Sequence, residues 1–179
     1  TALCVGEAEE ALVDVIEHLE EGKSIKGIPN ILISKDDKTG IRPLVHDLDS
    51  IPFMDRELVY SYPQMAKFGI KGIWTSRGCV FPCPYCFNNR QNKLFKGAGK
   101  IFRRRSVDSV INETKELISK YRTDFIRIQD DVFVYKVDDW LKEFAERWPV
   151  EIGKPFYCLV RSELVTDELV SYLKKAGCA

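Results

Sequence analysis

Three cysteines lie within eight consecutive residues, at Cys79, Cys83 and Cys86. Thiolates at this C-x3-C-x2-C spacing can converge on one soft metal centre, because a tight loop brings their sulfur atoms within bonding reach. Pro82 and Pro84 lie between them and favour a rigid loop over a packed helix. The segment therefore predicts a site for an iron–sulfur cluster or for a zinc ion.

The number of available ligands favours the cluster over zinc. A structural zinc site needs four ligands, and no fourth Cys or His lies near the loop: Cys158 is far downstream, and His18 and His46 are upstream. A cubane held by three cysteines leaves one iron without a protein ligand, free to bind a substrate or a cofactor. A zinc site completed from outside this chain stays an alternative, as does a turn of three packed core cysteines.

The remaining cysteines, Cys4, Cys158 and Cys178, are scattered through apolar surroundings. A secreted disulfide scaffold distributes its cysteines through a short, loop-rich chain, whereas an isolated free cysteine commonly packs as a small hydrophobe. The pattern therefore predicts a reducing compartment, and we expect a cytoplasmic protein.

The composition is that of a globular protein, with 45% hydrophobic and 30% charged residues. The 27 basic residues are balanced by 27 acidic ones, so nothing indicates a general binder of nucleic acid or of membrane surfaces. The longest apolar runs are too short to span a bilayer. The chain starts at Thr1 without a signal-peptide pattern and without Met, and we expect it to be a fragment of a longer protein.

Strand and helix patterns alternate along the chain. The expected strands cover 2–5, 72–75, 124–129 and 156–160, and the expected helices cover 7–21, 106–118, 138–148 and 166–177, with Ser106 and Thr166 as N-caps. A hairpin is expected from 31–33 and 41–42, around the turn-rich residues 35–40. From residue 67 onward the alternation predicts parallel βαβ units.

Residues 43–66 differ from their surroundings. Pro43, Pro52 and Pro63 punctuate polar and aromatic residues without sustained periodicity. This pattern is typical of an ordered linker, so we place a domain boundary inside it.

The cysteine motif and its flanks resemble the radical SAM superfamily. The motif follows a predicted strand, and the aromatic Tyr85 stands just before its third cysteine. Five flanking segments resemble the cobalamin-binding branch of that superfamily: Asp47–Arg56, Thr75–Cys79, Arg103–Val107, Gln129–Phe133 and Lys175–Cys178. The resemblance covers most of the chain.

The resemblance implies an α/β fold in two parts. Residues 67–179 would form the N-terminal half of the radical SAM domain, a partial (β/α) barrel of about three βα units. Residues 1–42 would be the C-terminal tail of a Rossmann-like cobalamin-binding domain, with Gly6–Glu9 similar to the family's Gly-Glu-Gly-Glu turn. Ala8 departs from that turn, which weakens the case for a close backbone approach to cobalamin there.

The resemblance also implies an enzyme with its cofactors and partners. Such an enzyme reductively cleaves S-adenosylmethionine at a [4Fe-4S] cluster to generate a 5′-deoxyadenosyl radical, and in this branch cobalamin often serves methyl transfer to an unreactive carbon. The implied partners are a small-molecule or peptide substrate and an electron donor such as flavodoxin or ferredoxin. A radical SAM methylthiotransferase-like enzyme or a cyclase is the alternative among enzymes. A zinc-stabilised binding module is the alternative from another class.

The three cysteines of the motif carry over as the metal ligands, and four further residues carry over as contacts of S-adenosylmethionine. Tyr85 would lie near the adenine, Asp130 and Asp131 follow a strand and match the segment that touches the methionine moiety, and the guanidinium of Arg161 suits the carboxylate. Structural roles stay open for all four: loop packing for the tyrosine, capping or solvation for the aspartates, and a surface salt bridge for the arginine. The run Arg103–Arg105 is expected to form a solvated face, with a role beside the cofactors as the alternative.

Overall fold

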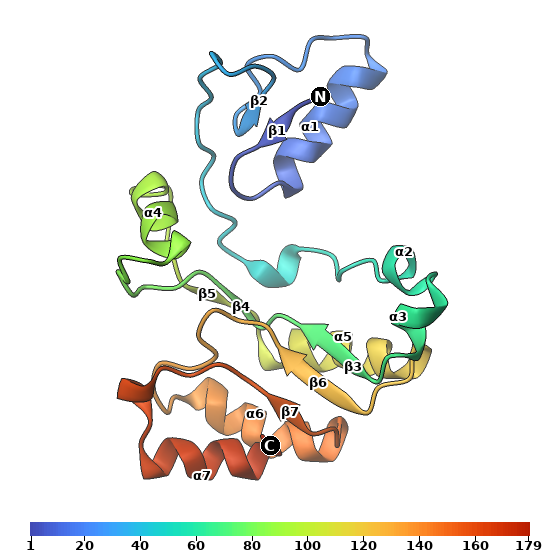
Figure 1. Cartoon of the computed structure of the whole chain (residues 1–179), viewed down its shortest axis with the longest axis vertical. Coiled ribbons are helices and arrows are strands. Elements are labelled where there is room, and N and C mark those ends of the chain that lie inside the picture. Colours follow the sequence, from blue (N-terminus) through green and yellow to red (C-terminus); the bar gives the residue numbers. More distant parts are fainter. The chain divides into compact units, whose positions relative to one another are not determined.

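The computed structural model describes the whole chain, Thr1–Ala179, which forms two compact units (Figure 1). The first unit comprises Thr1–His46 and Val80–Ile101, and the second comprises Asp47–Cys79 and Phe102–Ala179. The expected linker, 43–66, is therefore shared between the two units. The predicted domain boundaries stay a prediction, because compactness alone does not define an evolutionary domain.

The first unit combines a short antiparallel sheet with two helices. Strand β1 (Leu3–Cys4) pairs with β2 (Ile31–Leu32), and helix α1 (Glu9–Glu20) follows β1. Helix α4 (Phe87–Leu94) belongs to the same unit. The segment after α4 joins the unit closely, because a Cβ atom at Gly6 would lie only 2.3 Å from Cζ of the buried Phe95.

The expected hairpin is wrong, since β2 pairs with β1 and not with 41–42. Asn30, at a φ of 70°, accepts a hydrogen bond from the Arg42 amide through Oδ1 at 2.8 Å. Asp37 accepts hydrogen bonds from the amides of Ile33 and Ser34 through Oδ2, at 2.9 and 3.0 Å. These side chains satisfy the amides that a hairpin ladder would have used, so strand β2 ends at Leu32.

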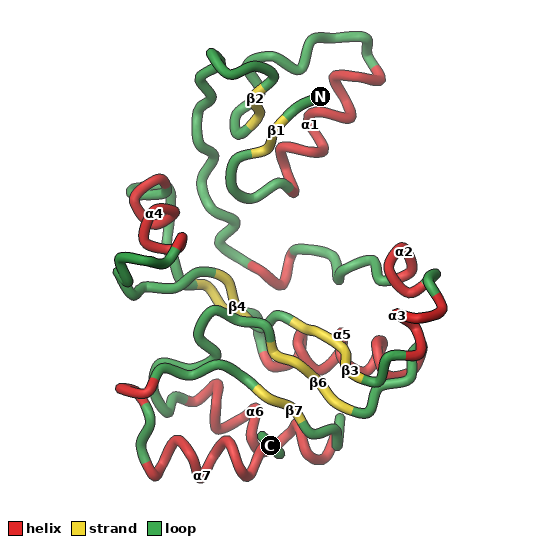
Figure 2. Tube along the Cα trace, in the orientation of Figure 1, coloured by secondary structure: helices red, strands yellow, loops and turns green.

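The second unit is built on a three-stranded parallel sheet with the order β3-β6-β7 (Figure 2). Its strands are β3 (Ile70–Ile73), β6 (Phe125–Ile128) and β7 (Phe156–Tyr157). The long helices between and after them are α5 (Val107–Lys120), α6 (Asp139–Glu151) and α7 (Asp167–Ala176). The predicted parallel βαβ arrangement is confirmed.

Helix boundaries in the second unit follow capping residues. The side chains of Ser106, Asp138 and Thr166 accept hydrogen bonds from the amides of Ser109, Leu141 and Leu169. Helix α7 ends at Gly177, whose φ of 91° closes the last turn in the left-handed conformation. The N-caps expected at Ser106 and Thr166 are therefore confirmed.

One apolar core joins the sheet to these helices. It includes Ile73, Ile126, Ile128 and Phe156 from the strands, together with Phe133, Phe144 and Trp148. Phe144 packs against Trp148 and Phe156 with ring centroids 4.9 and 5.6 Å apart. Burial of each such side chain contributes about 1.5–3 kcal/mol to stability. Cys158 and Cys178 pack against this core, in keeping with their expected apolar surroundings.

The remaining elements of the second unit are short. Strand β4 (Ser76–Arg77) pairs with β5 (Arg103–Arg104) in an antiparallel ladder. The short helices are η1 (Leu48–Ser50), α2 (Glu57–Tyr60), α3 (Pro63–Lys67) and η2 (Ser162–Leu164). None of the helices in the structure has the length and apolar character needed to cross a membrane.

Candidate functional site

The cysteine motif begins at the end of β4 in the second unit. Gly78, at a φ of 82°, turns the chain just before Cys79, whose side chain is buried. Cys83 and Cys86 belong to the first unit and are partly buried, and the Cys86 amide donates a hydrogen bond to the Cys83 carbonyl oxygen at 3.1 Å. The motif thus contains one tight turn and one glycine-dependent turn.

By donor type the motif fits an iron–sulfur cluster. All three thiols are free of disulfides, and iron–sulfur clusters are held by cysteine thiolates. No group of three or more His, Cys, Asp or Glu side chains is arranged in the structure to hold a metal ion, and this includes the three cysteines. Protein ligands often take up their final arrangement only when the metal binds. The assignment of these three cysteines therefore stays a prediction from residue type and spacing.

Asp130 is the most deeply buried of the predicted cofactor-binding residues, with 1% of its surface exposed. Its carboxylate accepts hydrogen bonds from the backbone amides of Thr75 and Ser76, at 2.8 and 3.2 Å, and from the hydroxyl groups of both residues. Burial raises the pKa of this carboxyl above its usual range, since desolvation penalises the charged form. The structure therefore ties Asp130 to the segment that leads to Cys79.

The other predicted contacts of S-adenosylmethionine are more exposed. Asp131 is exposed at the end of β6, and Tyr85 exposes 91% of its surface. Arg161 forms an ion pair with Glu163, and its hydrogen bonds hold the pKa of that carboxyl at about 2. The roles assigned to these three residues stay predictions.

The arginine run does not form the expected solvated face. Arg103 is buried, and the Arg104 guanidinium lies 4.5 Å from the Trp140 ring centroid while donating to the Phe133 carbonyl oxygen at 2.7 Å. Arg105 donates to Ser109 of α5 and to the carbonyl oxygen of Trp74. The partners Trp74, Phe133 and Trp140 come from distant segments, and they explain why the side chains of Arg104 and Arg105 are mostly withdrawn from solvent.

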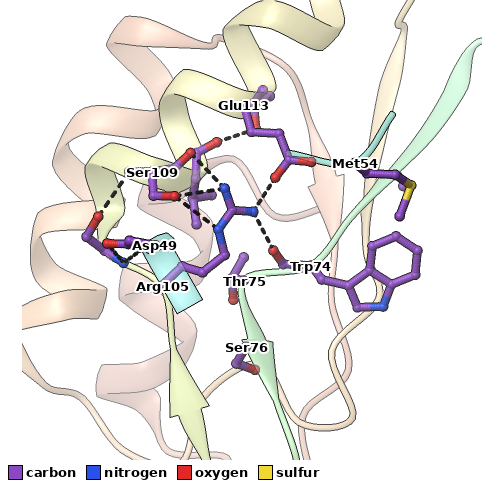
Figure 3. A network of polar contacts seen from close by, with 12 residues as sticks. Asp49, Met54, Trp74, Thr75, Ser76, Arg105, Ser109 and Glu113 are labelled. Atoms are coloured by element: carbon purple, nitrogen blue, oxygen red, sulfur yellow. Dashed lines mark hydrogen bonds and ion pairs between the residues drawn. The ribbon is translucent and has the colours of Figure 1, made fainter. Parts of the chain in front are cut away.

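Arg105 belongs to a buried charge network centred on Glu113 of α5 (Figure 3). Glu113 forms ion pairs with Arg105 and with Arg56, the latter at 2.6 Å. Arg56 also donates to the carbonyl oxygen of Gly72 at 3.2 Å, and Asp49 accepts from the Ser106 amide at 3.1 Å. The segment Asp47–Arg56 is therefore fixed to α5 and β3.

Sequence reasoning missed the role of Glu113, although a signal was present. Its neighbours in the helical pattern, Val110, Ile111, Thr114 and Leu117, are buried, so Glu113 occupies the buried face of α5. A carboxylate on such a face needs a cationic partner. Arg56 and Arg105 are those partners. Through Glu113 they link the arginine run to the segment Asp47–Arg56.

Comparison with known proteins identifies the family of the chain. Residues 73–179 match the family model described as the radical SAM superfamily. The chain belongs to this superfamily. The match begins in β3 and includes the whole cysteine motif, so the predicted resemblance is confirmed.

Two proteins that are similar to the chain in sequence carry methyltransferase names. The chain is 31% identical over 140 residues to the protein named uncharacterized methyltransferase PH0819, from Pyrococcus horikoshii, covering 74% of this chain and 28% of the relative. It is 28% identical over 143 residues to cytidylyl-2-hydroxyethylphosphonate methyltransferase from Streptomyces wedmorensis, covering 73% of this chain and 25% of the relative. The chain thus spans about a quarter of the length of these relatives.

Solved structures share the fold over nearly the whole chain. The cobalamin-dependent S-adenosylmethionine radical enzyme OxsB, with aqua-cobalamin bound, matches 99% of this chain with a TM-score of 0.69 and 16% identity, over 27% of its own length. The radical S-adenosylmethionine methyltransferase TsrM from Kitasatospora setae, with tryptophan and a SAM analogue bound, matches 99% of this chain with a TM-score of 0.69 and 18% identity, over 36% of its own length. At these identities the likeness establishes the α/β fold.

Proposed function

We propose that this chain is part of a radical SAM methyltransferase in which Cys79, Cys83 and Cys86 hold a [4Fe-4S] cluster. The observation that carries the proposal is the C-x3-C-x2-C motif that follows β3 in a chain of this superfamily. The names of both relatives support methyl transfer as the reaction class. When bound, the cluster would supply the electron that cleaves S-adenosylmethionine into methionine and a 5′-deoxyadenosyl radical.

The residues of the chain would bind and orient the cofactors. The buried Cys79 and the partly buried Cys83 and Cys86 are not joined in disulfides, and they would ligate iron after losing their protons. The exposed Tyr85 lies inside the motif, just before Cys86, and the exposed Asp131 follows β6; both would contact S-adenosylmethionine. The active sites of parallel α/β folds lie at the carboxyl ends of their strands, which is where β3 and β6 present these segments.

The domain organisation is proposed on the same basis. Residues 67–179 would form the first half of a (β/α) barrel, and the parallel sheet β3-β6-β7 supports this. Residues 1–42 would be the tail of a Rossmann-like cobalamin-binding domain, joined by 43–66 as a linker. The fold of the cobalamin-dependent enzyme OxsB matches 99% of the present chain. This likeness supports cobalamin as the methyl carrier.

Anaerobic reconstitution with iron and sulfide tests the ligands. The wild-type chain is expected to bind about four irons with equimolar acid-labile sulfide, and Cys79→Ala, Cys83→Ala and Cys86→Ala are each expected to abolish this. Cys158→Ala, which removes a free thiol outside the motif, is the matched control and should retain the cluster. Release of 5′-deoxyadenosine from S-adenosylmethionine then tests the reaction. Stoichiometric zinc without iron in the wild-type chain would instead support a binding module.

A further inference from the structure

Asp130 lies beside the residues that lead into the cysteine motif because of the register of the parallel sheet. Ile73 of β3 is paired with Ile128 of β6, and the Gln129 amide continues the ladder by donating to the Ile73 carbonyl oxygen at 2.9 Å. Thr75 and Asp130 each lie two residues beyond this pair. The register therefore carries the Asp130 carboxylate to the segment through which the chain leaves β3 for Cys79.

The carboxylate of Asp130 is fully used by this segment. A carboxylate can accept about four hydrogen bonds, two at each oxygen. Oδ1 accepts from the amides of Thr75 and Ser76, and Oδ2 accepts from their hydroxyl groups, with 2.8 Å between Oδ2 and Ser76 Oγ. All three residues are buried. The carboxylate has no remaining capacity for a charged group of a cofactor.

The same segment is held from a second direction. The Thr75 carbonyl oxygen accepts from the Arg105 amide at 2.9 Å, and the ladder between β4 and β5 fixes Ser76 and Arg77. Beyond that ladder only Gly78 separates the fixed backbone from Cys79. The backbone is therefore fixed as far as Arg77, two residues before Cys79.

We propose that Asp130 is a positioning residue for Cys79, holding Thr75 and Ser76 so that this thiol stays buried and correctly placed to bind iron. The proposal rests on the proposed function, since it takes Cys79 to be a cluster ligand. It replaces a direct contact between the Asp130 carboxylate and S-adenosylmethionine. The essential property of the residue is then its set of hydrogen bonds, and its negative charge is dispensable.

Two pairs of variants separate hydrogen bonding from charge. Asp130→Ala removes all four hydrogen bonds, whereas in Asp130→Asn the amide oxygen still accepts from the two backbone amides and the amide nitrogen can donate to the two hydroxyl groups. Thr75→Val removes one hydroxyl donor, and Thr75→Ser keeps it. Asp139→Ala removes a fully exposed carboxylate from the start of α6 and is the matched control.

Alkylation of the apoprotein measures the position of Cys79 without any cofactor. Mass spectrometry follows the rate for Cys79, with Cys158 in the same unit as the internal reference. Asp130→Ala is expected to raise the Cys79 rate about tenfold and to lower iron uptake on reconstitution by a similar factor, because buried donors lose their acceptors. Thr75→Val is expected to raise that rate about threefold. Asp130→Asn, Thr75→Ser and Asp139→Ala should match the wild-type chain in both measurements.

The outcomes distinguish this proposal from the proposed function. Wild-type protection of Cys79 in Asp130→Ala would overturn the positioning role, as would equal gains in reactivity at Cys79 and Cys158, which indicate general loosening. Loss of iron uptake in Asp130→Asn as severe as in Asp130→Ala would show that the charge is needed and would also overturn it. If Asp130→Ala does not fold, the Thr75 pair decides. Failure of the wild-type chain to bind iron would refute the proposed function and the role of Asp130 in iron binding, whereas the alkylation rates would still show whether Asp130 keeps the Cys79 thiol buried.

Discussion

The two faces of the sheet β3-β6-β7 differ sharply in what they carry. On one face Ile73, Ile128 and Phe156 are buried in the apolar core beneath the helices. On the other face Arg127 is exposed, and its guanidinium lies 5.6 Å from the ring centroid of its cross-strand neighbour Tyr157. The first face accounts for the stability of the second unit. The second face carries polar and aromatic groups that packing of this unit does not require.

Truncation of Phe144 to Ala is expected to have the largest effect, a loss of roughly 3–5 kcal/mol in the free energy of unfolding. Phe144 is fully buried, and its ring packs against Trp148 and Phe156 on the covered face. Urea unfolding followed by circular dichroism measures the loss. Tyr157→Ala, on the opposite face, is the control and should cost far less. Equal losses at the two positions would break the distinction between the faces.

The pH dependence of the free energy of unfolding is expected to show the titration of Asp130, which lies beyond the end of β6. Because burial raises the pKa of Asp130, the folded state holds its proton at a pH where the unfolded chain has already lost it. Wild-type stability should therefore fall, relative to that of Asp130→Asn, as the pH rises from about 4 through the raised pKa. Urea unfolding of both proteins across this range checks the sign. A wild-type stability that stays constant or rises relative to that of Asp130→Asn as the pH increases would contradict it.

Removal of the cap of α7 tests a helix that covers the apolar face. Thr166→Ala is expected to cost about 1 kcal/mol, because the Leu169 amide loses the Thr166 hydroxyl group as its acceptor. Thr166→Ser keeps an acceptor at the same position and should stay close to the wild-type value. Thermal unfolding of the three proteins provides the comparison. An unchanged melting temperature in Thr166→Ala would show that the cap does not contribute.

Substitution on the face of the sheet that carries Arg127 and Tyr157 is expected to have the smallest effect. Arg127→Ala should change the free energy of unfolding by about 0.5 kcal/mol or less, because an exposed arginine over a ring contributes little. The measurement is the same urea titration as for Phe144→Ala. A loss comparable to that of the Phe144 variant would show that this face is packed after all.

Local patterns in the sequence predicted most of the second unit. The strands β3, β6 and β7 and the caps Ser106 and Thr166 were expected from apolar runs and from side chains that satisfy helix amides. The parallel pairing followed from the alternation of strands and helices. These features depend on neighbours in the sequence, which a single chain displays directly.

The features that the sequence did not predict depend on distant partners. The amides of Ile33 and Arg42 donate to the side chains of Asp37 and Asn30 and not to the backbone of a partner strand, so the hairpin does not form. The Arg105 side chain is mostly withdrawn from solvent because Glu113 balances its charge, and Asp130 is buried because Thr75, just beyond β3, supplies hydrogen-bond donors. No local period encodes such pairs. The ligand role of the three cysteines rests on residue type and spacing, and it is still a prediction.

The attachment of Asp47–Arg56 has a consequence for how this part of the chain opens. Its proline, Pro52, and its lack of periodicity are typical of a loop, and loops are where proteases usually cut first. However, Asp49 bonds the backbone at the start of α5, and Arg56 pairs with Glu113 in the middle of that helix. Detaching the segment would leave a buried carboxylate with one cation fewer, so its exposure to a protease is tied to the opening of α5 itself. Limited digestion should therefore spare these residues until the helix unfolds.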